Sequence, residues 1–356
     1  MAKLSGNKGE WSEIYVLFKL LADGCLQGAD ENLNPDPKVL LKVLKVIRGD
    51  IEALAGTNIT IKSGLAEIKL KKSEVRDKAQ RLYKIICAGA ETASFSIPEL
   101  DSFFKKIGCA QVTTTHLRKR DITVQVEDTY TGERPLYGFS IKSEVGCPPT
   151  LLNATDATNL IYEVTGLSPN KIGQINDLEG RQKIKDRCCQ IRENMSEIKL
   201  VGYNSSTFHS NLQSIDDGLP NIVGHLLLAH YFYGCSTIAE AVTYLREKNP
   251  NKYSSLDLYE MKVKRFLRQV ALGMTPATVW DDADDATGGY IIVKPDGSLV
   301  AFYIYNRRLF DEYLFRNTKF ERGSTTRHKF MKLYPEKDAN GVSHTYIKLN
   351  LQIRFV

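Results

Sequence analysis

Two alternating segments with a turn-rich stretch between them constrain the centre of this chain. Residues 120–128 and 136–143 alternate apolar and polar side chains and are rich in β-branched residues, which is typical of half-buried strands. The connecting residues 129–135 include Gly, Pro and Thr, and these residue types favour turns. The sequence therefore predicts a β-hairpin.

The same alternation predicts which residues of the hairpin face each other. Opposed residues of an antiparallel pair lie on the same face of the sheet. With Ile122 opposite Ile141 on the buried face, Asp121 lies opposite Lys142 on the wetter face. Asp128 has the parity of the apolar face, so it is a weaker candidate for a polar site.

A carboxylate beside an ammonium group has two interpretations. One is a cross-strand ion pair on a surface hairpin, which contributes less than about 1 kcal/mol. The other is the metal site of a nuclease. Mg²⁺ typically takes one or two carboxylates together with waters and phosphate oxygens, and a nearby Lys can position the attacking water and offset negative charge. The hairpin alone leaves both interpretations open.

Length and composition exclude several classes of protein. The chain has 356 residues with 42% hydrophobic content, which is enough for one large domain or two. It has no long apolar run and starts with the polar segment Met1–Glu10, so we expect no membrane partner and a cytoplasmic location. Seven cysteines without a C-x-x-C motif argue against a zinc site or a disulfide framework. No P-loop motif is present.

Basic residues permit a nucleic-acid partner. The net charge of +6 is moderate, but one basic cluster abuts Asp121 and the segment 322–329 combines hydroxyl groups with cations. Such side chains contact phosphates and bases, although a solvated surface carries similar charge runs. The candidates for DNA binding are Arg118, Lys119, Arg120, Arg322, Ser324, Thr325, Thr326, Arg327, His328 and Lys329.

Glu13 lies within a predicted helix at residues 8–22 that ends at Gly24 and is apolar over most of its circumference. A buried carboxylate there needs a partner. A metal ion or a Lys would satisfy it. The alternative is a half-exposed Glu13 at the edge of the helix, paired with a basic residue.

The remaining pattern predicts a mixed α/β chain with a helical middle and a β-rich C-terminal part. Helices are expected at 37–48 and 153–164, a loop at 200–220, and a strongly apolar helix at 220–234 that makes His225 and His230 core residues. A strand is expected at 112–116 and a hairpin at 290–305.

Several long phrases resemble the HpaII-type restriction endonucleases. They are KGEWSEIYVLFKLLADG at 8–24, GFSIKSEVGCPPTLLNATDATNLIYE at 138–163, GGYIIVKPDG at 288–297, STTRHKF at 324–330 and YIKLNLQIRF at 346–355. The resemblance implies a type II enzyme that cuts duplex DNA at C-C-G-G with Mg²⁺ and leaves 5′-phosphates. It implies a restriction-endonuclease-like fold, with a mixed central sheet flanked by helices. We expect a nuclease core at 1–165 and a DNA-recognition part at 166–356, which could be continuous with the core.

The wider nuclease superfamily carries the pattern P-D…(D/E)-x-K. By resemblance Asp121 matches the Asp, Lys142 the Lys, and Ser140 the (D/E) position, while Arg120 replaces the Pro. Ser140 leaves the hairpin one carboxylate short. Some superfamily members take a carboxylate from a K-G-x-x-x-E helix, which Lys8 to Glu13 is similar to.

The resemblance assigns a role to each residue of the expected site. Asp121 and Glu13, with the Ile141 carbonyl, would hold the metal. Lys142 would orient the attacking water, and Ser140 would hydrogen-bond a water or ligand. Glu10 and Glu163 are the second and third choices for the missing carboxylate.

The expected partners are double-stranded DNA and a cognate methyltransferase in the same system, and a homodimer is compatible with this assignment. Two alternatives stay open at this point: a non-catalytic DNA-binding protein, and a structure-specific DNA repair nuclease. A requirement for Mg²⁺ and cleavage at one sequence would separate the restriction enzyme from both.

Overall fold

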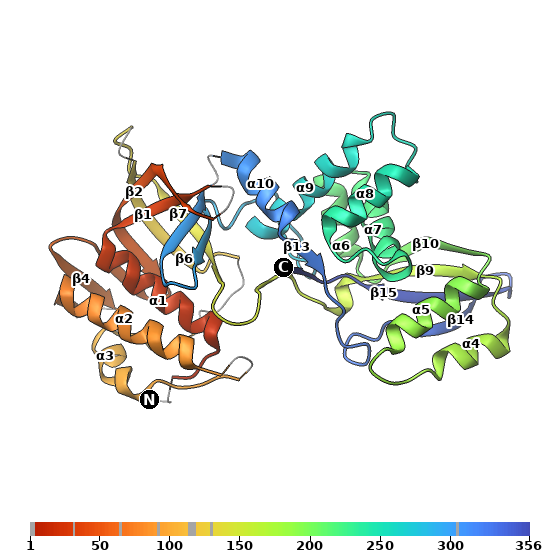
Figure 1. Ribbon diagram of the computed structural model, residues 1–356, viewed down its shortest axis with the longest axis horizontal. Coiled ribbons are helices and arrows are strands. Elements are labelled where there is room, and N and C mark those ends of the chain that lie inside the picture. The colour runs from red at the N-terminus through yellow and green to blue at the C-terminus, as the bar shows by residue number, and fades with distance from the viewer. Residues whose placement is uncertain are drawn as a thin grey trace. The chain divides into compact units, whose positions relative to one another are not determined.

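The computed structural model describes residues 4–30, 33–63, 66–90, 93–112, 119–128, 131–303 and 306–356 (Figure 1). Their packing divides the chain into two units. Unit 1 comprises residues 1–149, 271–273 and 283–313, and unit 2 comprises 150–270, 274–282 and 314–356. The sequence-based boundary lay at residue 165, whereas the chain here leaves unit 1 at residue 149 and returns to it at 283–313.

Unit 1 is built on one nine-stranded mixed sheet of order β1-β12-β11-β7-β6-β2-β3-β4-β5. An additional pairing of β1 with β2 closes the first six of these strands into a ring. Two pairs are parallel, β1 with β12 and β7 with β11. The strands are β1 Cys25–Ala29, β2 Pro35–Arg48, β3 Ile51–Leu54, β4 Asn58–Ser63, β5 Ala66–Lys71, β6 Ile122–Asp128, β7 Leu136–Ser143, β11 Gly289–Val293 and β12 Leu299–Tyr303.

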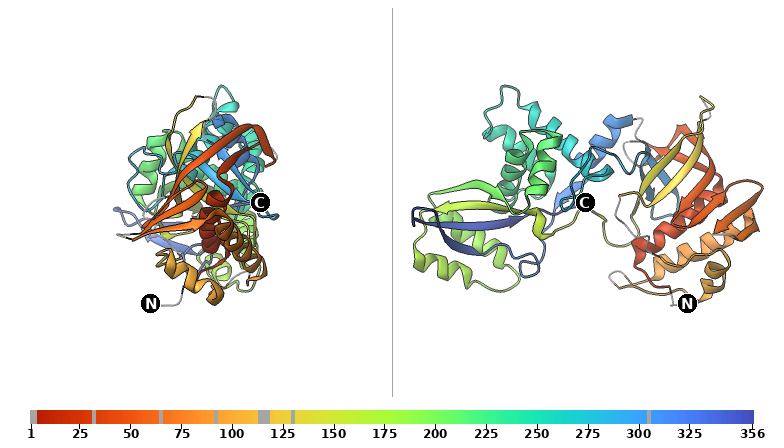
Figure 2. Two further views of the ribbon diagram at one scale, coloured as in Figure 1. Left: turned by 90° about the vertical axis from the view of Figure 1, so that its left-hand side faces the viewer. Right: turned by 180° about the vertical axis from the view of Figure 1, so that it is seen from behind.

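The helices of unit 1 cover this sheet and complete its core. Helices α1 (Lys8–Asp23) and α2 (Lys72–Ala88) lie side by side, as Figures 1 and 2 show from two sides. A 3-10 turn at Pro98–Leu100 leads into α3 (Asp101–Lys106). The predicted mixed α/β class is confirmed. The closure of six strands into a ring was not expected, and the restriction-endonuclease-like arrangement stays a prediction.

Helix α1 begins and ends where its sequence predicts. The Asn7 side chain accepts a hydrogen bond from the Glu10 backbone, and the Glu10 carboxylate accepts one from the Asn7 backbone, which is a capping box. Gly24 ends the helix in the left-handed conformation, with φ 76°, a conformation that glycine adopts without strain. The apolar circumference of α1 is buried because the sheet and α2 both contact it.

Unit 2 combines a four-stranded antiparallel sheet, β10-β9-β15-β14, with a three-stranded one, β13-β16-β8, and a group of helices. Its strands are β8 Thr150–Leu152, β9 Asn159–Thr165, β10 Glu197–Tyr203, β13 Thr318–Phe320, β14 Leu333–Lys337, β15 Ser343–Asn350 and β16 Ile353–Phe355. Its helices are α4 Pro169–Asn176, α5 Lys183–Asn194, α6 Ser206–Ile215, α7 Leu219–Tyr233 and α8 Ile238–Lys248, with a 3-10 turn at Asp156–Thr158. Helices α9 (Asp257–Leu272) and α10 (Arg307–Arg316) run across the boundaries of the units.

The helix expected at 37–48 is wrong, because these residues form most of the long strand β2. A bulge between Val43 and Lys45 interrupts its pairing with β6. The buried apolar positions are therefore Leu41, Val43 and Val46, a spacing that is no longer a strict alternation of two. Because of this bulge, the apolar residues of the strand recur at a spacing that resembles the pattern of a helix.

Two further predictions fail in unit 2. Residues 153–164, expected to be helical, contain a 3-10 turn and the first six residues of β9, where Leu160, Tyr162 and Val164 alternate into the core. The loop expected at 200–220 instead contains the end of β10 and all of α6. Ser205 caps α6 by accepting a hydrogen bond from Phe208. Polar residues that were interpreted as a loop are thus a helix start signal. The strand expected at 112–116 lies almost entirely outside the described residues.

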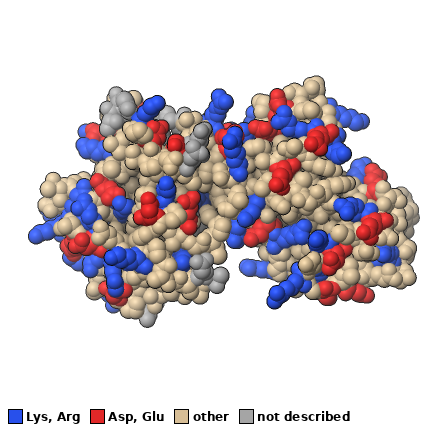
Figure 3. All heavy atoms as spheres, viewed as in Figure 1, with Lys and Arg blue, Asp and Glu red and all other residues tan. Residues whose placement is uncertain are grey.

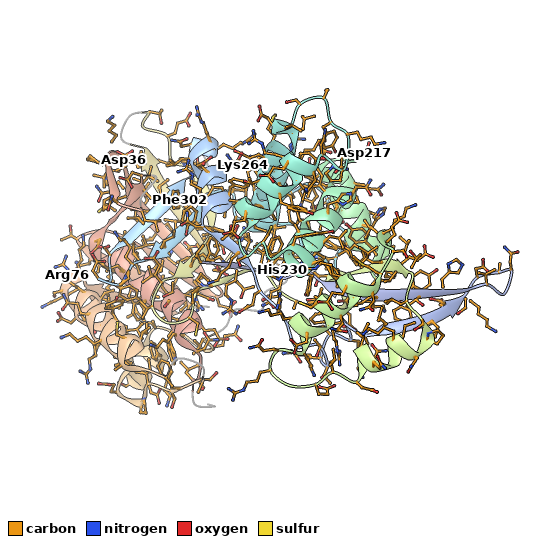
Figure 4. The ribbon with its side chains drawn as sticks, turned by 45° about the vertical axis from the view of Figure 1, so that its right-hand side comes forward. Asp36, Arg76, Asp217, His230, Lys264 and Phe302 are labelled. Atoms are coloured by element: carbon orange, nitrogen blue, oxygen red, sulfur yellow. The ribbon has the colours of Figure 1, made fainter. Side chains whose placement is uncertain are left out.

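His230 confirms the prediction of a core histidine. It lies on α7 (labelled in Figure 4), and its ring stacks on Phe320 with ring centroids 4.8 Å apart. Its Nδ1 lies 2.8 Å from the Cys235 carbonyl oxygen. Burial lowers the pKa of His230 to about 4. The imidazole is therefore neutral in the fold near neutral pH.

Candidate active site

Asp121, Ser140 and Lys142 form a hydrogen-bonded chain at the start of β6 and the middle of β7. The Ser140 hydroxyl donates to Asp121 Oδ2 at 3.0 Å, and the Ile141 N–H donates to the same oxygen at 2.6 Å. The Lys142 ammonium donates to Ser140 Oγ at 3.0 Å. The structure therefore brings together the carboxylate, the hydroxyl and the ammonium that the sequence selected.

The predicted register of this hairpin is wrong by two residues. Ile122 pairs with Phe139 instead of Ile141, and the Asp121 N–H donates to the Phe139 carbonyl at 2.9 Å. Asp121 therefore lies beside Ser140 and not directly opposite Lys142. Because side chains alternate with a period of two, a shift of two residues leaves every side chain on its predicted face. Asp121, Ser140 and Lys142 therefore share one face of the hairpin, as predicted.

Strand β11, which belongs to the hairpin predicted at 290–305, pairs with β7, and the sequence did not reveal that pairing. Tyr290 pairs with Ser140 and Ile292 with Lys142 in the parallel register. The Lys142 ammonium lies 5.1 Å from the centroid of the buried Tyr290 ring, a distance typical of a cation–π contact. Burial lowers the pKa of Lys142, while the negative charges of Asp121 and Glu13 oppose that shift.

Glu13 is buried on α1 and belongs electrostatically to this cluster. The Ser12 hydroxyl donates to Ser143 Oγ at 3.0 Å, which fixes α1 against the end of β7. Burial and the negative charge of Asp121 raise the pKa of Glu13 to about 7, and Arg48 opposes the rise. Two carboxylates are therefore close enough for each to feel the other's charge.

Arg48 is the partner of Glu13, and sequence reasoning did not find it. Its Nη2 donates to Glu13 Oε2 at 2.7 Å and also to the Val112 carbonyl. Arg48 is the last residue of β2 and is almost fully buried. Of the alternatives for Glu13, the structure shows a basic partner, but at a buried position and not at an exposed helix edge.

Lys119 and Arg120 lie beside the hairpin. The Lys119 N–H donates to Asp285 Oδ2 at 3.2 Å. Burial, with help from the charge of Lys142, lowers the pKa of Lys119 to about 8. A Cβ on Gly138 would meet Arg120 Cδ at 2.6 Å. Glycine at this position therefore allows the Arg120 side chain to pack closely against the backbone of β7. Arg118 lies outside the described residues.

The other two carboxylates proposed as metal ligands are engaged elsewhere. Glu10 completes the capping box of α1. Glu163 lies on β9 of unit 2, and its Oε1 is 2.5 Å from His344 Nδ1. Within the described ranges, no three side chains of the His, Cys, Asp or Glu type gather as a metal-binding group. Asp121 raises the pKa of Glu13 more than Glu10 does, so Asp121 and Glu13 remain the leading pair of carboxylates for this site.

The segment 322–329 forms a structured loop of unit 2 before β14. The Ser324 carbonyl accepts a hydrogen bond from His328, and Ser324 Oγ accepts one from the Arg327 N–H. The Asn159 side chain donates to the His328 carbonyl at 2.8 Å. Arg322, Ser324, Thr326, Arg327 and Lys329 are exposed, as DNA-contacting side chains must be.

Comparison with known proteins identifies the family. Residues 7–355 match the HpaII restriction endonuclease family. The chain is 38% identical over 363 residues to the type II restriction enzyme HpaII of Haemophilus parainfluenzae, and the match covers 99% of each chain. The chain belongs to the HpaII restriction endonuclease family. As a member, it is a site-specific deoxyribonuclease whose substrate is DNA.

No solved structure matches this HpaII family member. Among the described helices, none is both long and apolar enough to cross a membrane.

Proposed function

We propose that this HpaII family member hydrolyses duplex DNA at C-C-G-G in a reaction that requires Mg²⁺, with the Asp121–Ser140–Lys142 chain and Glu13 as its active site. The observation that carries the proposal is the bonded chain itself, in which one carboxylate and one ammonium are linked through a shared hydroxyl. The target sequence rests on the similarity to the HpaII enzyme. The cytoplasmic location expected from the sequence belongs to the same proposal.

The donor set fits a magnesium ion. The partly buried Asp121 and the buried Glu13 interact electrostatically, and Mg²⁺ commonly takes one or two carboxylates and completes its shell with water and substrate phosphate. Burial, and to a lesser degree the charge of Asp121, raise the pKa of Glu13 to about 7, so a charged Glu13 is costly in the protein alone. A cation would relieve that cost.

Asp121 and Glu13 would hold the ion, with the Ile141 carbonyl as an expected third donor. Bound there, Mg²⁺ would lower the pKa of a water and stabilise charge on the phosphate. Ser140 keeps Asp121 and Lys142 at fixed separation, because it donates to one and accepts from the other. Lys142 then orients the attacking water and offsets the charge that develops on the phosphate.

We assign sequence recognition to unit 2. The exposed hydroxyl and basic groups of residues 322–329 are suited to contacts with base edges and phosphates. Lys119 and Arg120, beside the hairpin, are suited to holding the scissile strand. A homodimer would match the two-fold symmetry of a palindromic site, and a methyltransferase of the same system would protect the host's own sites.

Digestion of a sequenced plasmid tests the proposal. With Mg²⁺ we expect cuts at every C-C-G-G site and nowhere else, with 5′-phosphate and 3′-hydroxyl ends, and with EDTA we expect intact DNA. Asp121→Asn should remove cleavage in Mg²⁺ and in Mn²⁺, whereas Asp128→Asn should remain active. Cutting that follows DNA structure instead of sequence, or an active Asp121→Asn protein, would refute the assignment.

A further inference from the structure

Unit 2 contains a cavity of about 480 Å³ beside the loop that precedes β14. Figure 3 draws one face of unit 2, on which Lys and Arg lie interspersed with Asp and Glu. Basic, hydroxyl and aromatic side chains line the cavity. The lining residues are Glu179, Lys183, Arg187, Thr325, Thr326, Lys329, Phe330, Lys332, Tyr334 and Lys348.

The cavity carries an excess of positive charge. Five of its lining residues are Lys or Arg and one is an acid. That acid, Glu179, is already paired, with Lys183 Nζ at 2.7 Å and Arg187 Nη2 at 3.4 Å. Lys348 donates to the neutral Asn204 amide oxygen at 2.7 Å. In the described part of the chain, no carboxylate forms an ion pair with Lys348 or with the exposed Lys332.

Buried hydrogen bonds hold the walls of the cavity in place. The fully buried Arg187 donates to the Met331 carbonyl at 2.9 Å and to the Leu178 carbonyl at 2.7 Å. The Asn176 side chain both donates to and accepts from the Leu333 backbone, at 2.8 and 2.9 Å. A ligand would therefore meet a preformed site, which lowers the entropy cost of binding.

The size of the cavity and its aromatic wall point to a ligand larger than phosphate. Its volume is within the range of pockets for small molecules and far exceeds the roughly 30 Å³ that one water occupies. Tyr334 and Phe330 line it together with the cations. Tyr334 is held by Tyr346, with ring centroids 5.9 Å apart. Aromatic side chains of this kind stack on nucleic-acid bases.

We propose that this cavity binds a nucleoside monophosphate unit, with the phosphate among Lys329, Lys332 and Lys348 and the base against Tyr334. Thr325 and Thr326 supply hydroxyl groups for the sugar or phosphate. The same chemistry has two sources: a nucleotide of the bound DNA strand turned out of the duplex, which costs unstacking energy, or a free nucleotide. The site lies in unit 2 and is separate from the hairpin of unit 1.

Calorimetric titration of the whole protein in EDTA tests the site without the metal. The probes are dGMP, dCMP, deoxyguanosine and inorganic phosphate. We expect at least one monophosphate to bind about tenfold or more tightly than both phosphate and the nucleoside, because stacking and charge act together. Equal binding of phosphate and the nucleotides would overturn the proposal, and so would an absence of nucleotide binding.

Variants assign the binding to this cavity. Lys332→Ala removes an exposed cation and Tyr334→Leu removes the ring, and each should weaken nucleotide binding about fivefold or more. Lys337→Ala is the matched control. Lys337 is exposed on β14, the strand that holds Tyr334 and begins directly after Lys332, but it does not line the cavity. Unchanged affinity in both cavity variants, or an equal loss in the control, would overturn the assignment.

Binding of labelled duplex DNA then distinguishes the two sources. If the occupant is a nucleotide of the DNA, excess nucleotide competes with the duplex. Lys332→Ala then reduces the slope of log binding constant against log salt concentration by about one. If it is a free nucleotide, Lys332→Ala leaves the salt dependence of DNA binding unchanged, although a nucleotide in the cavity still competes with the duplex for Thr325, Thr326 and Lys329. Both outcomes support a nucleotide site. Plasmid cleavage, measured in parallel, reports on the proposed hairpin site independently of this result.

Discussion

Lys142→Met separates the proposed catalytic role of Lys142 from any structural one. Met keeps the length and the apolar stem of Lys while removing the ammonium group. The stem remains beside the Tyr290 ring, which lies 5.1 Å from the ammonium in the wild type. Ser140 loses one donor but still donates to Asp121 at 3.0 Å, so no hydroxyl proton is left without an acceptor.

The two consequences of this change have different magnitudes. Burial disfavours the charged form of Lys142, so removing the charge offsets the lost hydrogen bond, and we expect the free energy of unfolding to change by less than about 1 kcal/mol. Removing a donor that stabilises charge in a transition state typically costs about 10²–10³ in rate, and loss of the water-orienting group adds to this.

Single-turnover cleavage of a plasmid, with urea unfolding of the same preparation, measures both quantities. We expect a loss of more than about a thousandfold in rate with specific DNA binding retained. Lys42→Met is the matched control, because Lys42 lies on β2 of the same sheet and pairs only at the surface with Glu127. Cleavage by Lys142→Met within about tenfold of wild type would refute the catalytic assignment.

Further changes test the surroundings of the site. Glu13→Gln should raise the Mg²⁺ concentration needed for cleavage or slow it more than about a hundredfold with the fold intact; an unchanged metal titration would exclude Glu13 as a ligand. Arg48→Met should destabilise the protein by about 3–5 kcal/mol in urea unfolding, because it leaves the Glu13 carboxylate buried without its partner, and adding Glu13→Gln should restore part of that loss. Arg327→Ala should cost about 1–3 kcal/mol of specific binding and relax discrimination at one base pair, and a loss uniform across sequences would mark a phosphate contact. Because burial lowers the pKa of His230 from 6.5 to about 4, its contribution to stability is complete above the unfolded pKa and declines as pH falls through that range, by up to about 3 kcal/mol; His230→Phe should remove this part of the acid dependence.

Local signals in the sequence predicted α1 and the hairpin of the candidate site. The boundaries of α1 follow from Asn7, Glu10 and Gly24, all within or next to the helix. The hairpin follows from alternation, and its faces were predicted correctly even though its register was not. Alternation fixes the parity of a strand, while register depends on the turn between the strands, and part of that turn lies outside the described residues.

Non-local pairing explains what the sequence could not supply. Strand β11 lies about 150 residues from β7 in the chain, and no local pattern indicates that Tyr290 would pair with Ser140. The sequence did not predict Arg48 as the partner of Glu13, because the bulge in β2 gives its strand an apolar spacing that resembles a helix. Both residues are placed by the order of strands in the sheet, which is a property of the whole unit.

The balance of charge gives a physical reason for Ser140 at the position where the nuclease pattern that this hairpin resembles has an acid. Asp121 and Glu13 already share the region with Arg48 and Lys142, two negative groups with two positive ones. A third carboxylate at position 140 would add an unpaired buried charge, which is costly, and would remove the hydroxyl that joins Asp121 to Lys142. If Asp121 and Glu13 are the metal's carboxylates, the ion depends on oxygens of the DNA phosphate to complete its shell. Metal binding and DNA binding are then coupled, so that the ion is held firmly only when the scissile strand is in place.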